Sequence, residues 1–342
     1  MSRIFPLVLI LSSAWLGVRL PRTDTGYVDL AQGRHVAEAG RLTPPDTILL
    51  PASPTDTSGW LGSWLLFIIH RVGGERGLHS LGAICLVVGT LLLYFVRPSG
   101  AGFAAAAAAA SLAGRTLDLS TSLFSWPLVT SMVFCWSTLR PKSKWWLLLL
   151  LVVLGAWPFL NRESMVGFAV AALALCTSLA KAIRGARRKE LNEGRIGVFQ
   201  EPALLAAVGS AAVMLALLTS PGQQLFVNPI REALLLKEAA NPGWEAASLS
   251  EDLLFFFLAT VTGLLALTAP PLVMPLEALA TAGLLLMSLA SRHFVTFFAA
   301  VAVPPVVDAL TKLAGSLTSS PRWSLRFLGG RWVSLVVGAA VL

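Results

Sequence analysis

Charged side chains gather in residues 24–47, DTGYVDLAQGRHVAEAGRLTPPDT, directly after the first long apolar run. Asp24 and Asp29 carry carboxylates, which can act as a general base or hold a divalent cation. Arg34 and His35 add basic groups that can bind a phosphate. These residue types predict phosphate or proton-transfer chemistry in this stretch.

The same stretch predicts a short amphipathic helix over 27–39 that stops at Gly40, because its apolar residues recur at helical spacing. Asp24 would lie at or just before the N-terminus of this helix, and Asp29 within about its first turn. An alternative therefore assigns Asp24 to capping the helix and Asp29 to complementing its dipole. Residue types alone leave both interpretations open.

A second polar group lies in WPFLNRES, residues 157–164, where an apolar helix is predicted to end at Pro158 and the chain to turn back. Arg162 could bind a phosphate in a bidentate manner, with Glu163 beside it. The alternative is a turn at the membrane interface in which Arg162 and Glu163 pair with each other.

A third group is SRHF, residues 291–294, between two apolar segments. Arg292 and His293 would lie at the N-terminus of a helix, where backbone N–H groups already favour an anion. They could form a phosphate site, or they could be a snorkelling arginine and a surface histidine. The long loop 220–250 contains a predicted amphipathic helix over 229–240, which could cover a cavity formed by these polar groups.

The composition is that of an integral membrane protein. Hydrophobic residues make up 56% of the 342 residues and charged residues 13%, about half the share of a soluble domain. The basic residues lie in short segments beside apolar runs, as topology determinants do, which argues against a nucleic-acid partner. The three cysteines lie inside apolar runs and are predicted to be small core residues, and no zinc motif occurs.

Ten apolar segments are predicted as membrane-spanning helices, with a weaker eleventh. They are 3–20, 77–96, 101–114, 121–139, 145–160, 164–182, 197–219, 251–268, 271–290 and 293–312, with 327–342 as the weaker one. We therefore expect an all-α polytopic protein with one transmembrane domain over 1–342.

The segment 60–72 decides the sidedness of every later helix. If it spans the membrane, the basic stretch 181–189 lies opposite the N-terminus, against the positive-inside rule. If 60–72 lies on the outer surface, 15 of the 26 Lys and Arg residues fall on the cytoplasmic side with the N-terminus. We choose this second topology, which places the first outer loop, 21–76, and the later polar connections around one extracytoplasmic cavity.

The order of these elements resembles the GT-C superfamily of bacterial membrane glycosyltransferases over about residues 1–312. The motifs are an outer loop that begins with Asp24 and continues to PPD at 44–46, the Trp-rich segment at 60–78, WPFLN at 157–161 and SRHFVTFFAAVAVPPV at 291–306. The resemblance implies interfacial helices in the first outer loop and a plasma-membrane enzyme with an extracytoplasmic site.

The resemblance also implies residue roles and substrates. The donor would be a sugar linked to polyprenyl phosphate, and Asp24 would deprotonate an acceptor hydroxyl, with Asp29 as a helper or a ligand of a divalent cation. Arg292 would neutralise the departing lipid phosphate. The chain departs from the family pattern at Val28, Ser63 and 161–164, where related sequences often carry His, an acid and N-x-H-G.

These departures keep three functions open. The first is glycosyl transfer from a lipid-linked donor to a hydroxyl of a lipid, glycan or protein. The second is a GT-C-like membrane subunit without catalysis, which would act with a membrane-protein partner. The third is a transporter or lipid flippase, which the near absence of charge inside the predicted helices disfavours.

Overall fold

The structure, a computed structural model, describes residues 4–40, 59–139, 145–161, 164–189, 200–217, 247–248, 252–268 and 275–318. These residues form helices and their connections, and no strand occurs among them. The predicted all-α fold class is therefore confirmed.

The long helices follow the predicted apolar segments. They are α1 (Ile4–Val18), α2 (Asp24–Ala39), α3 (Trp60–Val96), α4 (Gly100–Thr116), α5 (Ser125–Phe134), α6 (Trp145–Leu160), α7 (Ser164–Lys189), α9 (Gln200–Leu217), α11 (Leu253–Thr268), α12 (Pro275–Ala290) and α13 (Val295–Thr318). Three short helices accompany them: η1 (Thr121–Phe124), η2 (Cys135–Leu139) and η5 (Arg292–Phe294). The predicted segments 220–250 and 327–342 lie almost entirely or entirely outside the described residues.

Two helices continue beyond the predicted ends of their apolar segments. α7 runs to Lys189 where the segment was predicted to end at 182, and α13 runs to Thr318 where the prediction was 312. In α7 the extra turns contain the basic stretch 181–189. Lysine and arginine are good helix formers, and their charge is favourable near a helix C-terminus. The helix therefore continues past the apolar segment that predicted it.

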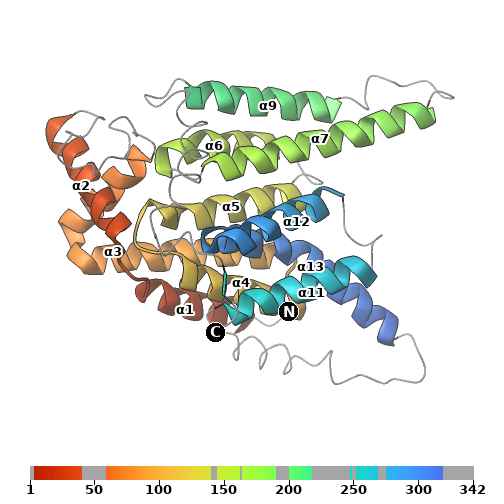
Figure 1. Cartoon of the computed structure of the whole chain (residues 1–342), viewed down its shortest axis with the longest axis horizontal. Helices are drawn as coiled ribbons and strands as arrows, with labels where there is room; N and C mark the ends of the chain where they lie inside the picture. Colours follow the sequence, from red (N-terminus) through yellow and green to blue (C-terminus); the bar gives the residue numbers. More distant parts are fainter. Residues whose placement is uncertain are drawn as a thin grey trace.

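The long helices lie side by side and successive helices reverse direction, so their connections alternate between two ends of the bundle (Figure 1). At one end α2 crosses the direction of the long helices (Figure 1). We call this the α2 end. It includes the segment after α1, the segment after α4, Asn161 after α6, and Ser291 after α12. The far end includes residues 97–99, between α3 and α4.

Small residues let the helices approach closely in the core. In the alanine run of α4, Ala106, Ala107, Ala109 and Ala110 are fully buried, as small residues at a close helix contact are. Cys85 and Cys135 are buried as predicted, whereas Cys176 on α7 is exposed and the core assignment for it was wrong.

The element α3 (Trp60–Val96) consists of two helical stretches that meet at a kink at Gly74, and the predicted segment 60–72 lies in the first of them. Gly74 has φ 58° and ψ −150°, a conformation that is essentially restricted to glycine. The kink divides α3 between the two segments predicted at 60–72 and 77–96. The first half packs with α2 at the α2 end, and the second half joins the bundle.

Pro158 does not end α6, which continues to Leu160. The prediction was wrong because a proline in the last turn removes only one intrahelical hydrogen bond. The helix still closes, since the backbone N–H of Asn161 donates to the Trp157 carbonyl at 2.8 Å. The Pro158 carbonyl accepts a hydrogen bond from the Gly59 N–H, which ties α6 to the start of α3.

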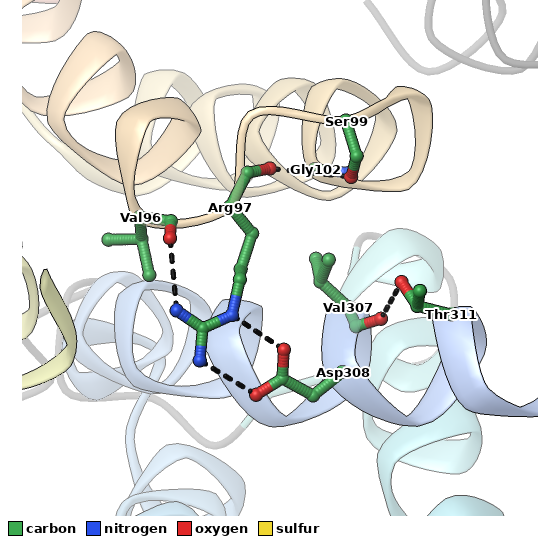
Figure 2. Close-up of polar contacts among 7 residues, drawn as sticks. All are labelled: Val96, Arg97, Ser99, Gly102, Val307, Asp308 and Thr311. Atoms are coloured by element: carbon green, nitrogen blue, oxygen red, sulfur yellow. Dashed lines mark hydrogen bonds and ion pairs between the residues drawn. The ribbon is translucent and has the colours of Figure 1, made fainter.

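A bidentate ion pair joins α3 to α13 at the far end (Figure 2). Arg97 Nε donates to Asp308 Oδ1 at 2.6 Å, and Arg97 Nη2 donates to Asp308 Oδ2 at 3.0 Å. Nη1 of the same guanidinium donates to the Val96 carbonyl. The residue that ends α3 is thereby attached to a helix more than 200 positions later in the chain.

Among the described helices, three segments are long and apolar enough to cross a membrane: Trp60–Val96, Thr121–Leu139 and Gln200–Leu217. Other apolar helices, such as α1 and α6 with 15 and 16 residues, are shorter. At 1.5 Å per residue they extend about 24 Å, less than a hydrocarbon core of about 30 Å. Their outward side chains are large, apolar and exposed, as with Leu11, Val152 and Phe257.

Candidate functional site

The α2 helix holds four of the predicted site residues. It begins at Asp24 and ends at Ala39, and Gly40 closes it in the left-handed conformation as predicted. The N-cap is Thr23, so Asp24 is the first helical residue and the capping role proposed for it was wrong. The side chain of Asp24 lies outside the described part of the structure.

Asp29 lies in the second turn of α2 rather than the first, and its side chain is fully buried. Its Oδ2 accepts a hydrogen bond of 2.7 Å from the backbone N–H of Thr121. A buried carboxylate needs such donors, because leaving water would otherwise be costly. The catalytic or metal-binding role predicted for Asp29 stays a prediction, and its observed contact fixes α2 against η1.

Arg34 and His35 lie further along α2, away from this contact. Arg34 is exposed and its Nε donates to Glu38 Oε1 at 2.9 Å, one helical turn later. Such an exposed pair contributes little to stability. His35 is half-buried. The phosphate-binding role of both residues stays a prediction.

Residues 117–122, LDLSTS, form the connector between α4 and α5, and they receive the start of α2. The hydroxyl of Thr23 donates to Oδ2 of Asp118, and the backbone N–H of Leu119 donates to the Pro21 carbonyl at 2.9 Å. Asp118 was not among the residues predicted from the sequence. A carboxylate followed by hydroxyl residues at +2 and +4, in a short break between apolar helices, was the available signal.

A second polar cluster lies where α3 bends. Arg22 forms an ion pair with Glu75, which follows the kink. The guanidinium carbon of Arg22 also lies 3.9 Å from the centre of the Tyr27 ring. His70, before the kink, has Nε2 3.5 Å from Glu75 Oε1. The two halves of α3 and the start of α2 are therefore connected through Glu75.

Arg292 lies in η5, before α13 as predicted, and contacts a carboxylate. Its Nη2 is 3.1 Å from Oδ1 of Asp252, which is only 4% exposed. Asp252 Oδ2 in turn accepts from the Ser248 N–H at the start of α11. The pairing places Arg292 at the junction of α11 and α13. Asp252, like Asp118, was not among the residues predicted from the sequence.

The other predicted site residues are only partly described. Arg162 and Glu163 lie outside the described residues, as does the side chain of His293. Asn161, the preceding residue, is buried and its Nδ2 donates to Ser125 Oγ. The end of α6 is thereby attached to the start of α5.

The connector brings two of these regions to one end of the bundle. Asp29 on α2 contacts Thr121, and the hydroxyl of Thr116, just before the connector, lies 2.5 Å from that of Thr296 on α13. Arg292 lies four residues before Thr296. The structure therefore places the Asp29 carboxylate and η5, which contains Arg292, at the same end of the bundle, both beside the connector or the residue before it. No group of three His, Cys, Asp or Glu side chains suited to a metal ion occurs in the described part of the chain.

An apolar groove runs between α5, α6, α7 and α13. Among its lining residues are Val129, Met132, Trp136, Trp157, Val170 and Val301. It extends from the first turn of α7 toward the far end of α5. Its lining offers hydrocarbon contacts and few polar groups, which suits an alkyl or isoprenoid chain.

No protein-family model matches this sequence, and the search of curated proteins found no match either.

Proposed function

We propose that this protein is a membrane glycosyltransferase that moves a sugar from a polyprenyl-phosphate-linked donor to a hydroxyl acceptor. Asp24 would be the general base, and the α2 end of the bundle would be the reaction site on the extracytoplasmic face. The proposal places ten or more helices in the membrane, with α2 and the first half of α3 lying along its surface.

One observation carries the proposal: α2 crosses one end of the helical bundle (Figure 1), the first half of α3 packs against it there, and Arg292 lies at the same end. A general base and a phosphate-binding cation must act within one cavity during glycosyl transfer. Asp29 and Arg292 lie more than 260 positions apart in the sequence. Asp29 nevertheless contacts Thr121 of the connector, and Thr296, four residues after Arg292, contacts Thr116 just before it.

The apolar surfaces support the membrane part of the proposal. Exposed leucine, valine and phenylalanine side chains point outward from α1, α6 and α11, where hydrocarbon would solvate them. The shorter helices could cross a membrane that thins locally or whose headgroups reach inward. The apolar groove beside α6 would accept the isoprenoid chain of the donor.

The test is the transfer of a radiolabelled sugar from polyprenyl phosphate by the purified full-length protein. We expect Asp24→Asn to lower kcat by about a hundredfold or more, since general-base catalysis contributes about that factor. Glu38→Gln is the matched control, because it neutralises another carboxylate of α2 that is exposed. Full activity in Asp24→Asn would remove Asp24 from the chemistry.

A second function, a membrane subunit without catalysis, is favoured by the contacts of two predicted site residues. Asp29 contacts the Thr121 N–H and Arg292 contacts Asp252, so both have roles in holding helices together. Stoichiometric co-purification with one membrane protein, without turnover or binding of a lipid phosphate, would favour this function. Measured transfer would contradict it.

A further inference from the structure

The first turn of α2 is held by the connector instead of by its own N-cap side chain. Thr23 has an extended backbone at the N-cap position, and its side chain makes no capping hydrogen bond. Its hydroxyl donates to Asp118 instead. We infer that Asp118 is a positioning residue that fixes Asp24, the next residue in the chain. This inference rests on the proposed function.

The carboxylate of Asp118 divides its two oxygens between the two segments. Oδ1 accepts from the hydroxyls of Ser120 at 2.5 Å and Ser122 at 2.7 Å, both within the connector. Oδ2 accepts from Thr23 at the start of α2. The two serines hold the carboxylate in one orientation, so its second oxygen is preorganised to receive Thr23.

Other contacts place α2 on the same connector. The Leu119 N–H donates to the Pro21 carbonyl at 2.9 Å. A methyl group at Gly26 would lie 2.6 Å from the Leu119 carbonyl oxygen, so only glycine allows this approach. With the bond from Thr121 to Asp29, the connector contacts α2 or its entry at four positions that flank Asp24 on both sides.

These contacts limit both the translation and the rotation of the first turn of α2. A displacement of about 1 Å at a reacting group can lower a rate by about a hundredfold. Asp118 acts through Thr23 on the placement of the general base and does not itself contact substrate. Its loss should therefore lower kcat more than it raises KM for the donor.

The experiment uses pairs of variants in the full-length protein. Thr23→Val removes the hydroxyl at nearly constant volume, while Thr23→Ser keeps it. Asp118→Asn removes the negative charge and replaces one of the two acceptor oxygens by an NH2 group, which cannot accept a hydrogen bond. Thr311→Val is the matched control, because it makes the same change of side chain and also removes one hydroxyl hydrogen bond, but within α13 at the far end of the bundle.

We expect kcat to fall about tenfold in Thr23→Val and in Asp118→Asn, the factor for one lost hydrogen bond to a charged group. KM for the donor should change less than twofold, and Thr23→Ser should keep at least half of the wild-type kcat. Thr311→Val should behave as the wild type. A merely structural role would instead lower the yield of folded protein and leave kcat unchanged.

Hydrogen–deuterium exchange separates this inference from the proposed function. In Thr23→Val and Asp118→Asn, exchange of the backbone amides at 24–29 should become about tenfold faster, with no change in α9. This result with an inactive wild type would keep the positioning of α2 and overturn glycosyl transfer. Unchanged exchange at 24–29, or unchanged kcat in an active protein, would overturn the role of Asp118.

Discussion

The kink in α3 depends on one glycine, and replacing Gly74 by alanine tests it. Gly74 has φ 58° and ψ −150°, and no atom lies within 4 Å of the position that a methyl group would take. The substitution therefore changes backbone strain without creating a clash. An alanine held in that conformation costs about 1–3 kcal/mol.

Gly73 provides the matched control, since it is helical and also has open space around it. Gly73→Ala should stabilise the protein by about 0.5–1 kcal/mol, because alanine loses less backbone entropy in a helix. Gly73→Ala should thus stabilise the protein and Gly74→Ala destabilise it. The free energies of unfolding of the two variants should differ by about 1.5–4 kcal/mol.

The free energy of unfolding can be measured by SDS titration of the purified protein in mixed micelles. Spin labels at the exposed positions Val72 and Ile84, in a Cys176→Ser background, report the bend of α3. If Gly74→Ala relieves its strain by straightening α3, the label distance approaches the roughly 18 Å of a continuous helix. Equal stability of the Gly73 and Gly74 variants, with an unchanged distance, would refute the reasoning.

Three further predictions concern helix contacts, measured by the same titration. Gly17→Ala should destabilise by about 1–3 kcal/mol, because its methyl group would lie 2.3 Å from the Ala83 Cα, whereas Gly209→Ala meets no atom and should not destabilise. In a double-mutant cycle, Arg97→Gln and Asp308→Asn should show a coupling energy of about 1 kcal/mol, which is small because both side chains are partly exposed. If the effects of the two substitutions are additive, the ion pair does not stabilise the protein. Arg292→Ala should cost about 2–4 kcal/mol by depriving a nearly buried carboxylate of its counter-charge, and Arg292→Lys should cost less.

Most helices could be predicted from the sequence because the apolar segments are long and have polar breaks. The segments 121–139 and 145–160, defined by hydropathy, match the structure at both ends, whereas the proline at 158 wrongly predicted an earlier end for α6. The ends of α7 and α13 could not be predicted from hydropathy, since polar helix formers continue a helix after its apolar face ends. The division of 60–96 into two segments was predicted from hydropathy, and the two helical stretches of α3 meet at Gly74, whose φ and ψ are not helical.

The site was less predictable than the fold, because side-chain pairing depends on tertiary contacts. Asp29 looked like a residue of the first turn and is instead buried against Thr121, 92 positions later. Asp118 and Asp252 gave no strong local signal, since acids beside the ends of apolar segments usually face solvent. Only the packed helices show that Thr23 and Arg292 are their partners.

The distribution of polar groups along the helices favours chemistry at one end over transport through the bundle. Hydroxyls in the middle of the described helices, such as Ser12, Thr90 and Thr130, donate to carbonyls three or four positions earlier. Such bonds satisfy a hydroxyl within its own helix and offer nothing to a solute. The described ion pairs Arg22–Glu75 and Arg97–Asp308 lie instead at opposite ends. A transport pathway needs polar groups that face one another across the interior. Substrate-dependent flux in proteoliposomes that survives Asp24→Asn would contradict this reasoning.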